Sequence, residues 1–370
     1  MTLMRVPWAR PDFGNAEKQA AIEVIKSGWV TQGKVTEEFE KGLSEYTGAK
    51  HVVCVSTGTA ALTTALLAHG IGAGDEVLVP SLTFIASINS VFSVGATPIL
   101  VDSDPGMWNT TPELMQEHLS DATKAIMPVD VAGMPVDVDS FERFAQEHDL
   151  ALIEDAAAAI GGAYKGKPMG YFDHTSTFSF HIAKSLQTIE GGCVLTPSAE
   201  IAKRCKSIRN HGMSAPYNSK ENLHYDYARY GLNFRITDIQ SAIGLAQLKK
   251  VDSQVAHRNR LVALYKEALG GDYGFQEVPS YVSMHPYLFF GIMVQDTNRD
   301  SLAKFLIKHD IDIRICWLPA HRQPYHRTLF RDVSLPGADE VGNKSIELPL
   351  GGCSEEEVNH VIKVIRQFKG

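Results

Sequence analysis

From residue 51 onward, short apolar runs alternate with segments whose apolar residues recur at helical spacing. The run HVVCVS at 51–56 is rich in β-branched residues, and Leu62 and Leu66 in the segment after it lie one helical turn apart. The alternation continues with strand-like runs at 75–81, 97–102, 124–133, 150–157, 175–181 and 192–196. Because such strands need cover on both faces, the pattern predicts an α/β fold built on a large, mostly parallel sheet.

The order of elements changes towards the C-terminus. A long helix is predicted to begin within 236–252, where Thr237 and Gln240 have the spacing of a capping box. Its apolar stripe would consist of Ile239, Ala242, Ile243 and Ala246. The pattern then predicts a strand, a helix, a second strand, a loop rich in proline and histidine, and a last helix, with the regular elements at 287–295, 299–310, 311–318 and 354–368. This order indicates a smaller C-terminal α/β domain.

Composition narrows the function classes. Apolar residues make up 44% of the 370 residues and charged residues 21%, as in ordinary globular proteins. The net charge of −8 argues against a nucleic-acid partner. The chain has no apolar run long enough to span a bilayer, and its first residues lack the apolar core of a signal peptide. We therefore expect a cytoplasmic protein without nucleic-acid or membrane partners.

The cysteines and histidines indicate neither disulfides nor a metal site. The five cysteines are scattered without a CxxC pair, at positions 54, 193, 205, 316 and 353. Cys54 and Cys193 lie in strand-like runs, where a free thiol packs as a small apolar group. His321 and His326 lie in an irregular segment, which favours a surface or substrate-contacting role over metal binding.

Two features of the predicted sheet are candidates for ligand binding. In the turn STGT after the first strand, Gly58 permits close approach of a phosphate to a helix N-terminus and Thr59 adds a hydroxyl, although an ordinary helix cap would look the same. Asp155 ends an apolar strand, at the edge where α/β proteins bind ligands, although a capping or loop aspartate would also fit. A carboxylate buried there needs a cation, such as a protonated pyridine nitrogen.

Lys184 is the third candidate, in the stretch FSFHIAKSLQTIEGG, which is poor in other charges. A lysine drawn into a cleft loses hydration, and its neutral amine can then form a Schiff base with an aldehyde. A solvated surface lysine is the usual alternative, but here a phosphate turn and a strand-end aspartate precede it. Pyridoxal phosphate requires all three contacts, so the sequence predicts a site for that cofactor.

Taken in order, the motifs resemble those of the DegT-type sugar aminotransferases, a branch of the fold-type-I pyridoxal-phosphate enzymes. The resemblance runs nearly end to end, through SGWVTQGKVTEEFE, STGTAAL, DEVLVPSLTFIASINSVFSVGATPILVD, LIEDAAAAIGGAYKGKPMG, FSFHIAKSLQTIEGG, IRNHGM, LNFRITDIQSAIGLAQLKKVD and IELPL. It implies a large, mixed, mostly parallel sheet domain at 31–250, preceded by an extended N-terminal arm at 1–30. A long helix and a small C-terminal α/β domain would follow at 251–370.

By motif position, the resemblance also implies roles for individual residues. Lys184 would bind the cofactor covalently and then move the substrate's proton, and Asp155 would face the pyridine nitrogen. Phe84 would stack on the cofactor ring, although core packing would also explain an aromatic residue there. The cofactor phosphate would be held by Gly58, Thr59, Ser179 and, from the other subunit of a homodimer, Asn233.

The activity implied by the resemblance is transfer of an amine from an amino acid, expected to be L-glutamate, to a nucleotide-linked keto sugar in amino-sugar biosynthesis. Trp317, His321 and Arg322 are the candidates for acceptor contact, with a solvated loop as the open alternative. Other open alternatives are a cyclitol or free keto sugar as acceptor, a sugar dehydratase, and a non-catalytic regulator of the same fold. Relatives that remove a hydroxyl have histidine at the lysine position, so Lys184 argues against dehydration.

Two positions depart from the family pattern. Ala158 stands where relatives often have His, Gln or Glu near the cofactor hydroxyl or the sugar, and Val129-Asp130 replaces a Val-His pair. Neither change affects the covalent chemistry. Both leave the identity of the acceptor sugar open.

Overall fold

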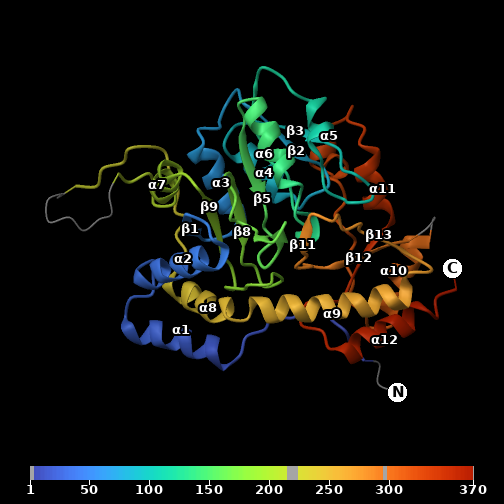
Figure 1. The fold of residues 1–370 in the computed structure, drawn as a ribbon. Helices are drawn as coiled ribbons and strands as arrows, with labels where there is room; N and C mark the ends of the chain where they lie inside the picture. The colour runs from blue at the N-terminus through green and yellow to red at the C-terminus, as the bar shows by residue number, and fades with distance from the viewer. Residues whose placement is uncertain (1–3, 215–223, 295–297, 370) are drawn as a thin grey trace.

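The structure, a computed structural model, describes residues 4–214, 224–294 and 298–369. Its main feature is a seven-stranded sheet in the order β1-β9-β8-β5-β4-β2-β3 (Figure 1). The strands are β1 (His51–Val55), β2 (Glu76–Pro80), β3 (Thr97–Val101), β4 (Thr123–Ile126), β5 (Ala151–Asp155), β8 (Thr175–Ser179) and β9 (Gly192–Thr196). β9 is antiparallel to β1 and β8, and the other neighbouring pairs are parallel. The predicted α/β class with a mostly parallel sheet is confirmed.

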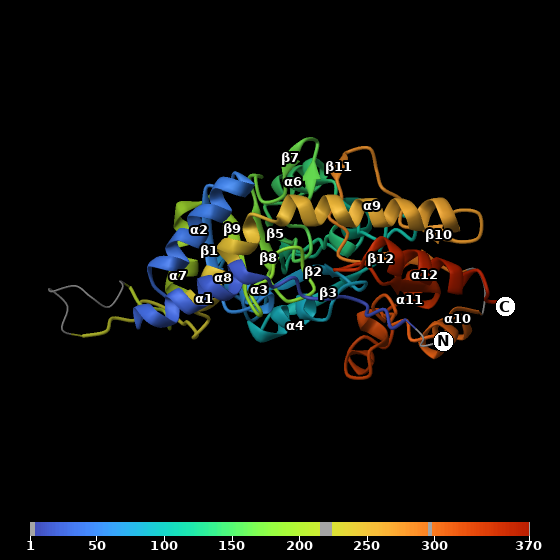
Figure 2. The same cartoon turned by 90° about the horizontal axis from the view of Figure 1, so that it is seen from below.

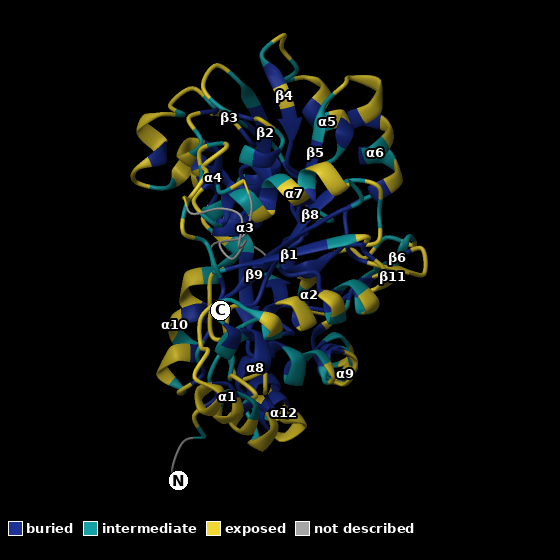
Figure 3. Cartoon of the chain, turned by 90° about the vertical axis from the view of Figure 1, so that its left-hand side faces the viewer, coloured by how far each residue is buried: buried dark blue, intermediate teal, exposed yellow. Residues whose placement is uncertain are grey.

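Helices cover both faces of this sheet, and its strands are accordingly buried along nearly their whole length (Figure 3). The covering helices are α2 (Lys34–Thr47), α3 (Gly58–Ala68), α4 (Ala86–Ser93), α5 (Pro112–Gln116), α6 (Val138–Glu147) and α7 (Ala199–Ile208). Leu62 and Leu66 of α3 pack into one apolar cluster with β2, and Phe39 of α2 packs into another with β8. Cys54 and Cys193 are buried in β1 and β9, as predicted.

The predicted long helix is divided into α8 (Asp238–Leu248) and α9 (Val251–Leu269). The predicted capping box at Thr237 and Gln240 is present. The helix breaks at Lys250, whose N–H bonds to the carbonyl of Gln247 at 2.8 Å in a turn tighter than that of an α-helix. This turn lets the Lys250 ammonium pair with Glu17 at 2.8 Å.

The predicted apolar stripe of α8 is only partly correct. Ala242 and Ile243 are buried, but Ile239 and Ala246 are half-buried. Polar residues are buried instead because α8 lies between α1 (Asn15–Ser27) and α2 and so has two packed sides (Figure 1). Among them is Asp238, whose carboxylate accepts the N–H groups of Gly33 and Thr36 at 2.8 and 3.0 Å and thereby caps α2.

The C-terminal part packs around α9. Its antiparallel sheet contains β10 (Gly274–Phe275), β12 (Phe290–Met293) and β13 (Ser345–Leu348), and its helices are α10 (Arg299–Lys308), α11 (Pro336–Lys344) and α12 (Glu355–Ile365). A small sheet contains β6 (Ala163–Tyr164), β7 (Lys167–Pro168) and β11 (Val282–Met284), and its β6–β11 pair joins a segment that follows β5 to one that follows α9. Seen from below, α9 joins the sheet end of the molecule to the C-terminal helices (Figure 2). The division at residues 30 and 250 stays a prediction.

The strand predicted at 311–318 is wrong. Ile311 bridges Val6 of the N-terminal segment, and Arg314 bridges Glu347 of β13. Because these partners belong to different segments, no continuous ladder forms. The N-terminal segment therefore runs along the C-terminal part before entering α1, so that the expected extended arm contains a helix.

None of the helices within the described ranges is both long and apolar enough to cross a membrane.

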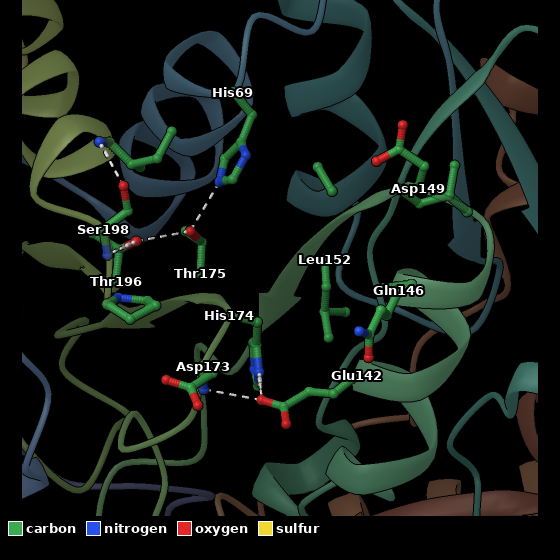
Figure 4. Close-up of a pocket in the computed structure, with 15 residues that line it drawn as sticks. His69, Glu142, Gln146, Asp149, Leu152, Asp173, His174, Thr175, Thr196 and Ser198 are labelled. Carbon is green, nitrogen blue, oxygen red and sulfur yellow. Dashed lines mark hydrogen bonds and ion pairs between the residues drawn. The ribbon is translucent and has the colours of Figure 1, made fainter.

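A cavity of about 630 Å³ opens at the amino ends of β5 and β8, between α6 and α7 (Figure 4). It lies at the opposite end of β5 from Asp155. His174 on its wall is hydrogen-bonded to Glu142 at 2.9 Å and to Glu154 at 3.1 Å. Burial by itself would lower the pKa of His174, but the two carboxylates raise it to about 9.

We expect the charged form of His174 to stabilise the fold, so that the free energy of unfolding decreases at alkaline pH. Because its pKa is higher in the folded state than in the unfolded state, its stabilisation is complete below the ordinary histidine pKa and is lost as pH rises through about 9. The contribution is at most about 3 kcal/mol. Thermal unfolding of the parent and of His174→Gln across this range measures it. Equal pH dependence of the two proteins would show that His174 is not charged in the fold.

Ile189, in the turn after Lys184, has a backbone φ of 72°, which is unfavourable for a β-branched residue. Its neighbours impose this conformation, because Thr188 donates its N–H to the carbonyl of Phe180 at 2.8 Å and Gln240 donates to that of Glu190 at 2.6 Å. We therefore expect Ile189→Gly to stabilise the fold by about 1 kcal/mol. Ile182→Gly, in the same loop but without a positive φ, is the control and should destabilise. Thermal unfolding of both variants measures the two effects. If Ile189→Gly destabilises the protein, the backbone at Ile189 is not strained.

Candidate active site

Asp155 is the last residue of β5, and its carboxylate is buried at the carboxyl edge of the large sheet. The Ser87 hydroxyl donates to Oδ2 at 2.6 Å, and the N–H of Ala157 donates to Oδ1 at 3.2 Å. Burial raises the pKa of Asp155, while these hydrogen bonds and the charge of Lys184 oppose the rise. The carboxylate is thus held in one orientation, and a cation beside it would stabilise its charge.

Ser87 links this carboxylate to the segment that carries Phe84. Its hydroxyl lies 2.7 Å from that of Thr83 and 3.1 Å from the carbonyl oxygen of Phe84. Sequence reasoning misses Ser87, because nothing local distinguishes it from the other serines at 86–93. Its role arises from a strand that lies 68 positions later in the chain.

Lys184 follows β8 in a turn at the same edge of the sheet. Its N–H donates to the carbonyl of His181 at 2.9 Å, and its carbonyl accepts from the side chain of Gln187 at 3.1 Å. Burial lowers the pKa of Lys184 to about 8, Asp155 opposes this shift, and the Arg258 charge adds to it. A larger fraction of this amine is therefore neutral near physiological pH than of an ordinary lysine.

Gly58 and Ser179 lie against each other where α3 begins. Thr57 caps the helix, because its side chain accepts the N–H of Ala60 at 3.0 Å. A Cβ at position 58 would lie 2.7 Å from the Cβ of Ser179, so a larger residue would displace the serine. Thr59 is exposed in the first turn, where helix N–H groups have no partner within the helix. The candidate phosphate residues of two distant segments are therefore adjacent.

Asn233 lies near the same turn, with its side chain exposed. Its backbone forms an isolated bridge with Asn210, and the next carbonyl, of Phe234, accepts the N–H of Ser56 at 2.8 Å. The segment LNFR is therefore fixed beside the turn that leads into α3, and the Asn233 side chain is accessible at the surface.

Phe84 and Trp317 lie together at this edge. Phe84 is 59% exposed, and its ring centroid lies 6.4 Å from that of Trp317 at an interplanar angle of 60°. Trp317 also packs against Phe289, with ring centroids 5.9 Å apart. The structure thus brings the loop after residue 316 to the exposed ring of Phe84, whose backbone carbonyl lies next to Ser87.

His321 and Arg322 attach that loop to the rest of the molecule. His321 is buried, with Nδ1 2.8 Å from the hydroxyl of Ser81 and Nε2 3.3 Å from Asp339. Arg322 donates to Asp339 at 3.3 Å and to Asn343 at 2.5 Å. These contacts join the loop to the residue that follows β2 and to α11.

The two positions that depart from the family pattern both lie near Asp155. Asp130 is buried, its N–H donates to the carbonyl of Asp155 at 3.1 Å, and its Oδ1 accepts the N–H of Val136 at 2.9 Å. Its Oδ2 has no hydrogen-bond partner among the described residues. Burial raises the pKa of Asp130 well above its usual range, and Glu154 adds to the rise. Ala158 is buried in an apolar cluster.

Comparison with known proteins places this arrangement in a family. Residues 11–366 match the model of the DegT/DnrJ/EryC1/StrS aminotransferase family. The chain is 37% identical over 372 residues to a GDP-perosamine synthase of Caulobacter vibrioides, with 99% of this chain and 98% of the relative covered.

Solved structures agree with this match. DesV of S. venezuelae in complex with a ketimine intermediate superposes with a TM-score of 0.90 at 30% identity, with 98% of each chain covered. A putative sugar aminotransferase of Streptococcus pneumoniae in its PLP form has a TM-score of 0.90 at 27% identity, with 98% of each chain covered. The predicted fold of the pyridoxal-phosphate aminotransferases is thereby confirmed. The chain belongs to the DegT/DnrJ/EryC1/StrS aminotransferase family.

Proposed function

We propose that this protein transfers an amino group from an amino acid, L-glutamate in our expectation, to a nucleotide-linked keto sugar, with pyridoxal phosphate as cofactor. The observation that carries the proposal is the meeting of Asp155, Lys184 and the Gly58–Ser179 contact at one edge of the sheet. The relative named GDP-perosamine synthase supports a nucleotide-linked sugar and a place in amino-sugar biosynthesis.

The chain's own residues fit the cofactor. Because Gly58 has no side chain, Ser179 lies close against the N-terminus of α3, where Thr59 and Ser179 would donate hydroxyl hydrogen bonds to a phosphate. Asp155, buried and oriented by Ser87, would hold a proton on the ring nitrogen. Phe84, whose ring is exposed and whose backbone carbonyl contacts Ser87, would cover one ring face.

When bound, pyridoxal phosphate supplies an aldehyde that accepts an amine and a ring that withdraws an electron pair. The Lys184 amine would hold the cofactor covalently until the donor amine displaces it. Because burial keeps the pKa of Lys184 near 8, the released amine can accept a proton from the substrate and return it to the cofactor side.

We also propose where the acceptor and the second subunit lie. Trp317, packed beside Phe84, would contact the acceptor sugar. His321 and Arg322 would contribute to the acceptor site by anchoring the loop that carries Trp317. The exposed Asn233 side chain would reach the cofactor phosphate of the other subunit in a homodimer. The buried free thiols suit a reducing cytoplasm.

Lys184→Ala should reduce amino transfer by about 10³-fold or more, because both the covalent anchor and the proton carrier are removed. Product formation from glutamate and a panel of nucleotide-linked keto sugars, GDP-linked sugars first, is measured by mass spectrometry. Lys165→Ala, at an exposed lysine paired with Asp139, is the matched control and should keep the parent rate. Borohydride reduction should fix the cofactor on Lys184. Transfer at the parent rate by Lys184→Ala would refute the proposal.

Mixing two defective variants tests the shared site. Lys184→Ala and Asn233→Ala subunits, each poorly active alone, should regain about half the parent activity per mixed dimer, because one of its two sites then collects both defects and the other collects neither. Subunit exchange is followed with a tag on one variant. If exchange is complete and activity does not rise, Asn233 serves the site of its own chain.

A further inference from the structure

Arg258 of α9 is a buried cation whose hydrogen bonds go to backbone carbonyls. It is 3% exposed, and its guanidinium donates to the carbonyl of Tyr287 at 2.9 Å and to those of Ala183 and Lys184 at 3.3 and 3.5 Å. No carboxylate lies within ion-pair distance of it in the described part of the chain. A buried charge without such a partner is unfavourable, so its presence needs a reason.

Linking α9 to nearby loops does not require a charge. On either side of Arg258, His257 binds the carbonyl of Cys353 at 2.8 Å and Asn259 donates to the carbonyl of His285 at 2.9 Å. These are side chains that can be neutral. The guanidinium occurs at the position that faces the turn of Lys184, and its planar fork reaches two segments at once.

The charge of Arg258 also acts on the Lys184 amine. A neighbouring cation repels an ammonium group and favours the neutral amine, whereas Asp155 of β5 and Glu347 of β13 favour the charged form. Burial raises the pKa of Glu347 to about 8 and lowers that of Arg258 to about 10, so that Arg258 stays charged near neutral pH. The positive charge of Arg258 therefore stays constant over the pH range in which Lys184 and Glu347 titrate.

We propose that Arg258 is a positioning residue for the reaction, which holds the backbone of Ala183 and Lys184 against α9 and places a fixed positive charge beside the lysine. The inference rests on the proposed function of Lys184. It assigns Arg258 two separable effects. The hydrogen bonds orient the turn, and the charge favours the neutral amine.

Two substitutions separate these effects. Arg258→Met is neutral and of similar length, and Arg258→Lys keeps the charge but cannot reach both segments with a planar fork. Asn259→Ala removes the neighbouring carbonyl contact on the same helix and is the control for a merely structural role. Arg258→Gln replaces the methionine variant as the neutral test if that variant does not fold.

The first measurement uses cofactor-free protein. The pH dependence of Lys184 acetylation by acetic anhydride, read by peptide mass spectrometry with exposed Lys165 as internal standard, reports the titration of the amine. We expect the midpoint to rise by about one pH unit in Arg258→Met. It should stay at the parent value in Arg258→Lys and Asn259→Ala. If the acetylation midpoint of Arg258→Met equals that of the parent, the charge of Arg258 does not act on the Lys184 amine.

The second measurement uses the loaded enzyme. Arg258→Lys should lower kcat at least about tenfold with little change in KM, because a misoriented amine slows proton transfer without weakening substrate binding. The absorbance of the lysine-bound cofactor is also titrated with pH. The midpoints of the variants should rank in the same order as their acetylation midpoints. If the kcat of Arg258→Lys falls no further than that of Asn259→Ala, Arg258 is only structural. If Lys184→Ala still transfers amine, the proposed function fails instead, whatever the acetylation shows.

Discussion

The parallel pairing of β5 with β8 is the constraint on which the candidate site depends. Parallel strands end at the same edge of a sheet, and the register of this pair sets Asp155 opposite Thr177, with Ser179 at the end of β8 and Lys184 in the turn beyond it. The edge also receives the turn into α3, because a Cβ on Gly58 would contact Ser179. One pairing therefore brings a carboxylate, an amine and a helix N-terminus together.

Among the described residues, buried charges have close partners of opposite charge in the scaffold but not at the candidate site. In the scaffold, Arg209 pairs with Glu40 and with the carbonyl of Cys54, and His174 is held between two carboxylates. At the site, Asp155 and Lys184 form no close ion pair with any residue that the structure describes, and burial is the largest influence on the pKa of each. A site arranged in this way keeps groups that can change protonation, whereas the scaffold neutralises its charges.

Local sequence patterns predicted most helices and strands correctly, because the formation of each of these elements depends on residues close in sequence. The capping box at Thr237 and the alternation of strands and helices are of this kind. The errors occurred where distant partners decide. Residues 311–318 have a strand-like composition, but their partners Val6 and Glu347 lie on different segments. The helix at 236–252 breaks near Lys250, which pairs with Glu17 of α1.

The sequence by itself determined the fold class, the family and the chemically distinctive residues, because ordered motifs such as STGTAAL, IEDAA and SFHIAK retain their meaning without a structure. Only the tertiary structure decided how those residues are supported. The Ser87 bond to Asp155, the approach of Trp317 to Phe84 and the buried charge of Arg258 join segments that are far apart in the chain. Such contacts arise from sheet register and helix packing, and neither the local composition nor the spacing of those residues encodes them.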